Sequence, residues 1–462
     1  MKTRNKVNYF VILVTFITML KTIQKFVLIG FGLWINLGFA QSKMYFTNGI
    51  HKQKIPFEFH HNLIIIPMEV NGVELNFILD TGASKTVIFT LNERDSLVLN
   101  NTQNVELRGM GTGEPIQAIL SEQNNTKLGH IIGVDQTIYM VYDEHFDFSS
   151  KVGMTIHGII GYEFLKNFVT TIDFTKKLII VENTSHFKIP ESKKFSKLDL
   201  TFHQNKPYLD GKIKLPGSLE FDAKMLIDTG NSDALWVFED HEKNVLCPTP
   251  YFIDYLGEGL SGSIEGKRTK IQSFQFGEYK FENPTIAFLD STATTYARVF
   301  EERNGSIGNQ IINRFKIILD YPNKTLYLKK NNTFSQEFRY NRTGIELSYF
   351  GKVLVENKVL PSENNYTNHE NENGHVVSFM IDYEYEFKPL YGIYKIRKDS
   401  PADVAGLKVN DMLYSIDGKL AHELELEEIN HIFQGDIGRN LTIQVDRNGI
   451  RYTFKLQLKD LL

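Results

Sequence analysis

Apolar positions fall in short runs along most of the chain, and turn-forming residues separate the runs. Residues 62–70 and 74–79 are two such runs, joined by an Asn-Gly pair that is typical of a two-residue β-hairpin turn. Short β-rich runs recur at 178–181 and 325–328, whereas helical character is brief. Because Gly, Asn and Asp interrupt the chain at short intervals, the pattern favours a sheet-rich barrel or sandwich over alternating βα units.

Four features of the first half of the chain recur in the same order 147 or 148 residues later. The first, Phe-Ile-Leu-Asp-Thr-Gly-Ala-Ser around Asp80, returns as Met-Leu-Ile-Asp-Thr-Gly-Asn-Ser around Asp228. Chance recurrence of one tripeptide is common, but four matches at a nearly constant offset indicate a duplicated domain. The matched segments are 77–84 with 225–232, 109–113 with 257–262, 158–161 with 305–308, and 168–174 with 315–321.

Each copy places an aspartate at the end of an apolar run, directly before Thr and Gly. A glycine there permits a tight turn that a Cβ atom would obstruct, and the threonine hydroxyl can hydrogen-bond to a neighbouring turn. A pseudo-twofold arrangement would bring Asp80 and Asp228 face to face. Two carboxylates that close cannot both ionise, so they share one proton and can activate a water molecule for attack on a peptide carbonyl. The repeat therefore predicts hydrolysis by these two aspartates.

These motifs resemble those of pepsin/retropepsin-type aspartic proteases, with both lobes in one chain. In that family the fold is all-β, the active site lies between the lobes, and no metal is used. The resemblance implies that Asp80 and Asp228 are catalytic and that Thr81 and Thr229 are interlocking hydroxyls. It also implies site-supporting residues Gly82, Ala83, Ser84, Gly230, Asn231 and Ser232, flap residues Gly109, Met110, Gly111, Gly113, Gly257, Gly259 and Gly262, and ψ-loop residues Ile160, Gly161, Ile307 and Gly308.

The sequence departs from the pepsin pattern at two places. Ala83 follows the first Asp-Thr-Gly, as in retroviral-type enzymes, whereas Asn231 follows the second. Two-lobed pepsins usually have a hydroxyl there that bonds the outer carboxylate oxygen. Asn231 could do so through its amide, or it could alter the acid strength of Asp228. Because neither glycine cluster contains the tyrosine of a pepsin flap, the closer likeness is to bacterial retropepsin-like proteins.

The composition changes from about residue 341. The run Ser-Pro-Ala, Ala-Gly-Leu, Asn-Asp-Met-Leu and Ile-Asp-Gly within 400–418 resembles the PDZ domains appended to bacterial proteases. The resemblance implies that a peptide binds by strand addition, its terminal carboxylate held by backbone N–H groups of Leu390, Tyr391, Gly392 and Ile393. A purely structural module is the alternative. Residues 357–388, rich in Asn and Glu, are expected to form a solvated loop.

Two apolar stretches open the chain, at 9–20 and 26–40, and each is shorter than the roughly 20 residues of a membrane-spanning helix. Lys21 and Lys25 precede the second stretch, and Gly-Phe-Ala ends it before Gln41, which is typical of a cleaved secretory signal with a possible true start at Met19. An uncleaved membrane anchor stays open. We expect an exported protein of the periplasm or cell envelope that meets the membrane only through this N-terminal segment.

Composition and charge exclude several classes of function. Apolar residues make up 42% of the chain, and its net charge of −4 offers no positive field to nucleic acid. A single cysteine, Cys247, excludes an intramolecular disulfide framework and a cysteine-based zinc cluster. His60 and His61 lack partners at ligand spacing. We therefore expect no metal and no cofactor.

Together these observations predict a mainly β protein with two pseudo-symmetric β-barrel lobes and a C-terminal α+β PDZ domain. The expected function is an aspartic endopeptidase that acts on protein or peptide substrates, with a possible C-terminal peptide ligand at the PDZ domain. Two alternatives stay open: a non-catalytic periplasmic binding protein that retains a protease-like cleft, and a protease whose PDZ domain gates access. The expected domains are a signal peptide at 1–40, lobe 1 at 45–190, lobe 2 at 195–332, and the PDZ domain at 341–460 with an insertion near 357–388.

Overall fold

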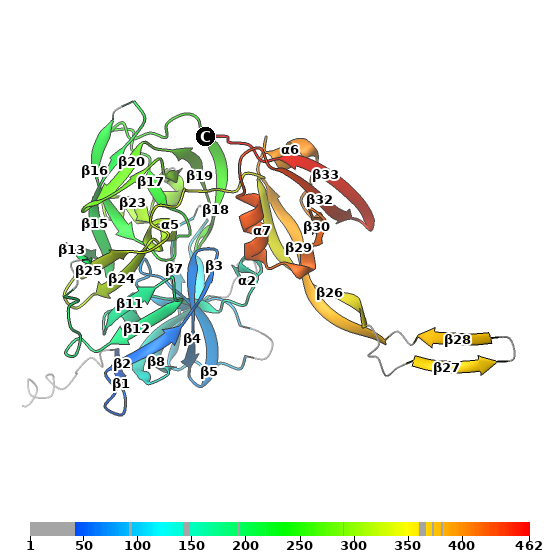
Figure 1. Ribbon diagram of the computed structural model, residues 1–462. Helices are drawn as coiled ribbons and strands as arrows, with labels where there is room; N and C mark the ends of the chain where they lie inside the picture. Colours follow the sequence, from blue (N-terminus) through cyan, green and yellow to red (C-terminus); the bar gives the residue numbers. More distant parts are fainter. Residues whose placement is uncertain are drawn as a thin grey trace, which may run out of the picture. The chain divides into compact units, whose positions relative to one another are not determined.

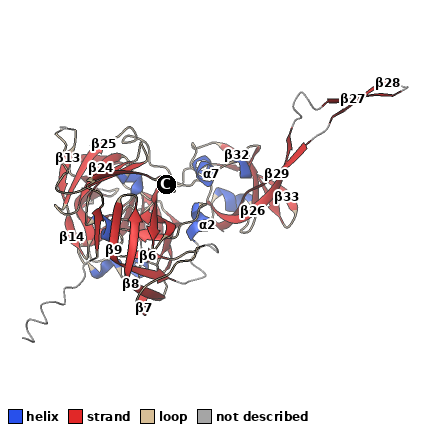
Figure 2. Cartoon of the chain, turned by 90° about the horizontal axis from the view of Figure 1, so that it is seen from below, coloured by secondary structure: helices blue, strands red, loops and turns tan. Residues whose placement is uncertain are grey.

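The computed structural model describes residues 42–462 except 92–94, 112, 142–147, 192–193, 218, 290, 360–365, 372–373 and 380–381. The predicted signal peptide therefore lies outside the described residues. None of the described helices is both long enough and apolar enough to span a membrane. Strands make up most of the described chain, and the helices between them are short (Figure 2).

Lobe 1 is built on a nine-stranded sheet, in which eight strands follow the order β1-β9-β6-β10-β5-β4-β8-β7 and β3 pairs with β4 (Figure 1). The predicted hairpin is confirmed, because Asn71 and Gly72 both have positive φ between β4 and β5. Short helices α2 (Phe148–Val152) and α3 (Tyr162–Leu165) flank β10. The strands are β1 (Lys43–Phe46), β3 (Glu58–His60), β4 (Leu63–Val70), β5 (Val73–Leu79), β6 (Thr86–Ile88), β7 (Thr102–Leu107), β8 (Ile116–Leu128), β9 (Ile131–Val141) and β10 (Gly158–Ile160).

Lobe 2 repeats this arrangement in a ten-stranded sheet, in which nine strands follow the order β18-β19-β22-β17-β23-β16-β15-β20-β21 and β14 pairs with β15. Its central strands correspond to those of lobe 1, since β23 pairs in parallel with β16 as β10 does with β5. Helices α4 (Ser291–Thr294), η1 (Ala297–Val299) and α5 (Asn309–Ile312) lie around β23 in the sequence. The strands are β14 (Thr201–His203), β15 (Lys206–Lys214), β16 (Glu220–Ile227), β17 (Leu235–Phe238), β18 (Phe252–Gly259), β19 (Gly262–Lys270), β20 (Ser273–Phe276), β21 (Tyr279–Glu282), β22 (Thr285–Leu289) and β23 (Arg303–Ile307).

A six-stranded sheet joins the two lobes, because both contribute strands to it in the order β13-β25-β24-β11-β12-β2. At its centre β11 of lobe 1 runs antiparallel to β24 of lobe 2. One continuous apolar core includes buried residues of both lobes and of this sheet. The strands are β2 (Lys52–Pro56), β11 (Val169–Asp173), β12 (Leu178–Glu182), β13 (Ser196–Asp199), β24 (Phe315–Asp320) and β25 (Thr325–Lys330).

The C-terminal part has a separate core around a sheet of order β26-β29-β30-β32-β33, with β31 paired to β30. The helix predicted near residue 400 is confirmed as α6 (Pro401–Ala405), with Ser400 as its N-cap and left-handed Gly406 at its end. The prediction of a solvated loop at 357–388 is wrong. Much of this segment forms the hairpin of β27 and β28 and extensions of β26 and β29 (Figure 1). The elements are β26 (Ile345–Val359), β27 (Tyr366–Asn371), β28 (Gly374–Phe379), β29 (Asp382–Ile396), β30 (Met412–Ile416), β31 (Lys419–Leu420), η2 (Ala421–Glu423), α7 (Leu426–Phe433), β32 (Asn440–Arg447) and β33 (Ile450–Gln457).

The predicted fold class is confirmed. The chain is mainly β, and the two sheets with corresponding central strands are the two lobes that the sequence led us to expect. Apolar side chains that alternate or run continuously along these strands form the cores, as in β4, where six of eight residues are buried.

Candidate active site

The two motif aspartates follow directly after corresponding strands. β5 ends at Leu79, and the Asp80 N–H donates to the Ile160 carbonyl oxygen at 2.8 Å. In lobe 2 the Asp228 N–H donates to the Ile307 carbonyl oxygen at 3.0 Å. Each carboxylate is therefore held by a parallel strand pair within its own lobe, and the predicted ψ-loop isoleucines provide the acceptors.

The threonines of the two motifs exchange hydrogen bonds between the lobes. The Thr81 N–H donates to Thr229 Oγ1, and the Thr229 N–H donates to Thr81 Oγ1, both at 3.0 Å. The Thr81 hydroxyl donates to the Ile227 carbonyl oxygen at 2.6 Å, and the Thr229 hydroxyl to that of Leu79 at 2.7 Å. Both threonines are fully buried. Because the donors and acceptors satisfy one another across the lobe boundary, they fix the two aspartate turns against each other.

The carboxyl groups of Asp80 and Asp228 lie within hydrogen-bond distance of each other. The Gly82 N–H donates to Asp80 Oδ1 at 2.7 Å. A Cβ on Gly230 would lie only 2.5 Å from Asp80 Cγ, so glycine is needed at this crossing. Burial and the neighbouring Asp228 charge together raise the pKa of Asp80 to about 7. The pair therefore retains one shared proton into the neutral range.

The ψ-loop glycines are packed beneath the aspartate turns. A Cβ on Gly161 would overlap the carbonyl oxygens of Asp80 and Ala83, and one on Gly308 would overlap that of Asp233. Ala83 also accepts from the Tyr162 N–H at 3.0 Å through its carbonyl oxygen. Helices α3 and α5 begin directly after these glycines. The structure therefore brings all four predicted ψ-loop residues to the pair.

Two of the remaining supporting residues, Asn231 and Ser232, form hydrogen bonds at the lobe 2 turn. Asn231 is buried, and its Oδ1 accepts from the Asp233 N–H at 2.9 Å, while its Nδ2 has no hydrogen-bond partner among the described residues. The bond from Asn231 to the Asp228 carboxylate, which the sequence suggested, is not formed. The Ser232 carbonyl oxygen accepts from Asn62 Nδ2 at 3.0 Å, which links its turn to lobe 1. Ser84 is half-buried.

The two glycine clusters lie at hairpin tips that contact each other: the lobe 1 cluster lies between β7 and β8, and the lobe 2 cluster spans the end of β18 and the start of β19. The Gly113 N–H donates to the Ser261 carbonyl oxygen at 2.6 Å, and the Ser261 N–H donates to that of Met110 at 3.1 Å. A Cβ on Gly259 would overlap the Met110 carbonyl oxygen, so close backbone approach depends on glycine there. Both lobes therefore contribute a flap, and Ser261 is a contact residue that the motifs did not single out.

Two cations near the pair were missed by sequence reasoning. Lys206 begins β15 and is half-buried, and Arg303 begins β23 with 4% of its surface exposed. The charges of both act on Asp80 and Asp228. At the repeat offset Arg303 corresponds to the apolar Ile156, which is a signal that the sequence offered, but the lobe 1 equivalent of Lys206 is visible only in the strand register. Metal ligation has no support in the described residues, which hold no group of three or more His, Cys, Asp or Glu able to bind an ion.

Comparison with known families now agrees with this geometry. Residues 66–164, which include Asp80 and run from β4 into α3, match the family described as aspartyl protease. The matched segment lies within the first lobe. Residues 392–447 match a PDZ domain, so both resemblances seen in the sequence are confirmed. No curated protein matches the chain. Among solved structures, an aspartic proteinase from Irpex lacteus is similar with 14% identity and a TM-score of 0.39, over 62% of this chain and 99% of that chain.

The PDZ domain that follows the protease lobes has its free sheet edges at strands other than the one that the sequence suggested. Residues 390–393 lie in β29, which is paired on both sides, since Gly392 lies opposite Ser348 of β26 and Met412 of β30. Tyr391 is buried, and its hydroxyl donates to the Leu424 carbonyl oxygen. Ile393 also has neighbours on both sides, because it lies opposite Leu347 and its N–H donates to the Asp411 carbonyl oxygen, so a ligand strand cannot be added at Gly392 or Ile393. The strand order leaves β26 and β33 as the two edge strands.

Lobe 1 contacts the β26 edge of the PDZ domain through α2. Ser348 Oγ of β26 lies 2.8 Å from Ser150 Oγ of α2. Gly153, one residue after α2, lies against Leu426 of α7. The segment around α2 thus contacts both β26 and α7, the two elements that would flank an added peptide.

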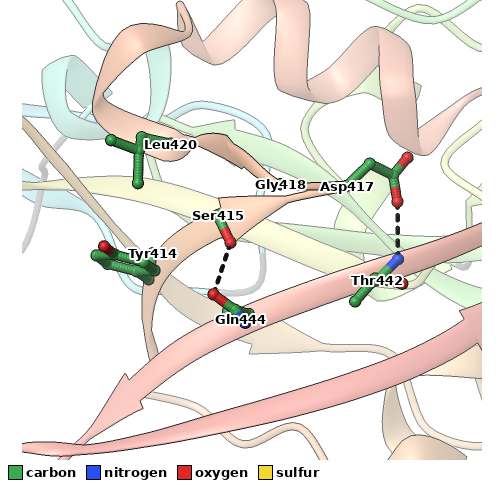
Figure 3. A pocket seen from close by; sticks show the side chains of 7 residues that line it. All are labelled: Tyr414, Ser415, Asp417, Gly418, Leu420, Thr442 and Gln444. Atoms are coloured by element: carbon green, nitrogen blue, oxygen red, sulfur yellow. Dashed lines mark hydrogen bonds between the residues drawn. The ribbon is translucent and has the colours of Figure 1, made fainter.

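A shallow hollow elsewhere in the PDZ domain lies over β30 and β32 (Figure 3). Ser415 Oγ donates to Gln444 Oε1 at 3.0 Å, and the Thr442 N–H donates to Asp417 Oδ1 at 2.8 Å, so several of its polar groups bond to each other. Both strands are interior to the sheet, so a peptide cannot join them by edge addition.

Proposed function

We propose that the protein is an aspartic endopeptidase. Asp80 and Asp228 together would catalyse hydrolysis of a peptide bond of the substrate. The observation that carries the proposal is the pair of adjoining carboxyl groups, held by reciprocal threonine hydrogen bonds between the two lobes. A binding protein without activity would not need a carboxyl pair that retains a proton near pH 7. The match of residues 66–164 to aspartyl proteases supports the same conclusion.

The proposed mechanism uses the single proton of the pair. The ionised carboxylate takes a proton from a water molecule held between the two groups, and the water oxygen attacks the peptide carbonyl carbon. The protonated carboxyl donates to the carbonyl oxygen as negative charge develops there. Because the two carboxyl groups are coupled, the proton belongs to the pair, and one of the two acts as the donor while the other acts as the base.

The test is proteolysis of an unfolded protein substrate by the purified chain from acidic to neutral pH. Asp80→Asn and Asp228→Asn should each reduce cleavage by about a thousandfold or more, because either change removes half of the acid–base pair. The matched control is Asp222→Asn, an exposed aspartate at the start of β16 that should leave the rate unchanged. Cleavage that survives either active-site change, with folding shown by circular dichroism, would overturn the assignment.

We further propose that the PDZ domain binds peptides or protein C-termini at the β26 edge. The support is that no strand of the sheet pairs with the outer edge of β26, and that the segment around α2 contacts both β26 and Leu426 of α7. Because α2 contacts both elements, a bound peptide would compete with α2 of the protease. This arrangement keeps the gated-protease alternative open, with occupancy of the PDZ domain acting on lobe 1.

A further inference from the structure

The two lobes differ in chemistry at four corresponding positions around the aspartate pair. Ile65 lies opposite Ile78 in lobe 1, and Tyr208 occupies the same register opposite Leu226 in lobe 2. On the other side of β5 and β16, Ile159 and Ser306 correspond in the same way. Continuing the β4 and β15 registers places Leu63 opposite Asp80 and Lys206 opposite Asp228.

The fourth pair is Ile156 and Arg303. The residue after each accepts a hydrogen bond from the neighbouring strand in the same way: His157 Nδ1 from the Asn76 N–H, and Asn304 Oδ1 from the Lys224 N–H, both at 2.8 Å. In lobe 1 the four positions are apolar and lie in one cluster. In lobe 2 they are Lys206, Tyr208, Arg303 and Ser306.

The lobe 2 residues form a built polar cluster. Arg303 donates to Ser306 Oγ at 2.7 Å, to the Gly305 carbonyl oxygen at 3.2 Å and to the Tyr208 hydroxyl oxygen. Its guanidinium carbon lies 5.1 Å from the centre of the Phe238 ring. Tyr208 and Ser306 are buried, whereas Lys206 is half-buried and so opens the cluster towards solvent.

The charges in this region do not balance. The carboxylates that act on Lys206 and Arg303 are those of the pair, which carries a single negative charge when it holds one proton. Two positive charges against one negative charge leave a surplus of one positive charge. Burial and the Arg303 charge lower the pKa of Lys206, which shows that this charge is poorly compensated. One further carboxylate beside Lys206 would balance the cluster.

We propose that Lys206, Arg303, Tyr208 and Ser306 form a subsite that binds the acidic side chain of a substrate residue directly flanking the scissile bond. This inference rests on the proposed endopeptidase function and names its substrate class: peptides with Glu or Asp beside the cleaved bond. Lys206 forms the ion pair with the substrate carboxylate, and Arg303 with Tyr208 and Ser306 supplies the fixed donors and the positive field behind it. The apolar positions of lobe 1 provide the opposite, uncharged wall.

The test uses pairs of fluorogenic peptides that differ only by Glu or Gln at one of the two positions flanking the scissile bond. At one of those positions the native protein should cleave the Glu peptide with a kcat/KM at least tenfold higher. The double change Lys206→Leu and Arg303→Ile introduces the lobe 1 residues and should bring the Glu/Gln ratio close to one. Equal cleavage of Glu and Gln peptides by the native protein at both positions would overturn the proposal.

The control is Lys212→Leu on the same strand, an exposed lysine whose loss should not change the Glu/Gln ratio. Because Arg303 is buried and its removal can unfold lobe 2, the single change Lys206→Glu is measured as well. That change should reverse the selectivity and favour a Lys residue over Glu at the same peptide position. An unchanged ratio in a folded Lys206→Glu variant would also overturn the subsite.

Binding separates this proposal from the proposed function. Uncleavable peptides with a reduced scissile bond, carrying Glu or Gln, are titrated into the native chain by calorimetry. Tighter binding of the Glu form by tenfold or more without cleavage of any peptide would support the subsite and contradict the endopeptidase. Cleavage with no Glu preference would support the endopeptidase and overturn the subsite, and absence of both binding and cleavage would overturn both.

Discussion

At the residue scale, the raised pKa of Asp80 sets the pH range in which the pair can act. Burial and the Asp228 charge both disfavour loss of the proton, so the carboxyl stays protonated up to about pH 7. The donor role needs the protonated form, and the base role needs its partner ionised. Activity therefore depends on the singly protonated pair, which exists between the two pKa values that belong to the pair together.

We expect kcat/KM for a neutral peptide to fall as the pH rises through about 7, because the pair then loses its shared proton. The measurement is a pH profile with substrate below KM in buffers of constant ionic strength. A plateau that extends past pH 9, or a fall that is complete below pH 5, would contradict the assignment of the shared proton to this pair.

Another residue shows how burial suppresses reactivity. Cys247 is partly buried, and burial together with the nearby Glu239 charge raises the pKa of its thiol to about 12. The thiolate is the reactive form, so this cysteine is poorly nucleophilic at neutral pH. A single thiol is in this way compatible with the export that the N-terminal sequence predicts.

At the scale of the elements, the two flap hairpins are joined to each other, because their tips exchange backbone hydrogen bonds. Gly111, Gly113 and Gly259 make this contact possible, because a Cβ atom at any of the three would overlap a backbone carbonyl oxygen of the opposite tip. The contact involves only the ends of two hairpins, while the strands behind them are held by their own sheet pairings. A change at a tip should therefore affect closure over substrate more than global stability.

Gly259→Ala is expected to lower kcat/KM about tenfold or more, because its Cβ would overlap the Met110 carbonyl oxygen and separate the tips. The melting temperature should change by only a few degrees. Ser263→Ala, at an exposed position on the same hairpin, is the control and should leave both values unchanged. A Gly259→Ala variant with native activity would show that tip contact is not needed for turnover.

At the scale of the whole molecule, a buried charge network connects the PDZ domain with the Asp228 turn. Arg397 Nη1 of the PDZ domain lies 3.3 Å from Asp254 Oδ1 of β18, and Arg268 Nη1 lies 2.9 Å from Asp233 Oδ1. Arg268 also pairs with Asp254 at 2.5 Å. Because Asp233 donates its N–H to Asn231 Oδ1, the chain of contacts ends in the loop that follows Asp228. This is a physical route by which the PDZ domain could act on the site.

The PDZ residue Glu346 makes the stability of the folded protein depend on pH. Burial first, and then the Asp254 charge, raise the pKa of Glu346 to about 8. In the unfolded chain the carboxyl releases its proton near its ordinary value of 4.5. The folded protein therefore binds one more proton than the unfolded chain between about pH 4.5 and 8, so this group lowers stability as the pH rises through that window.

Glu346→Gln should remove this loss, since the amide has no proton to release and can still accept from Asn341. Relative to the native protein, its melting temperature should be similar at pH 4.5 and higher by several degrees at pH 8. Glu356→Gln, at an exposed position on the same strand, serves as the control. A difference that does not grow with pH would contradict the raised pKa of Glu346.

The sequence alone determined the local features that short motifs require. Asp80, Asp228, their threonines and the glycines of the tight turns could be predicted, because each turn needs those residue types at fixed spacing. The strand-rich fold followed from the apolar runs. The PDZ domain was visible in one segment of turns and caps at 400–418, although its edge strands were not.

Tertiary structure decided which residues meet across strands and domains. The position of Lys206 beside the pair depends on the register of β15, and the free edge at β26 depends on the order of strands. The contact between Arg397 and Asp254 joins residues 143 positions apart in the chain. Apolar and polar patterns specify which face of a strand is buried, but they do not specify its neighbour, so these pairings become visible only when the chain has folded.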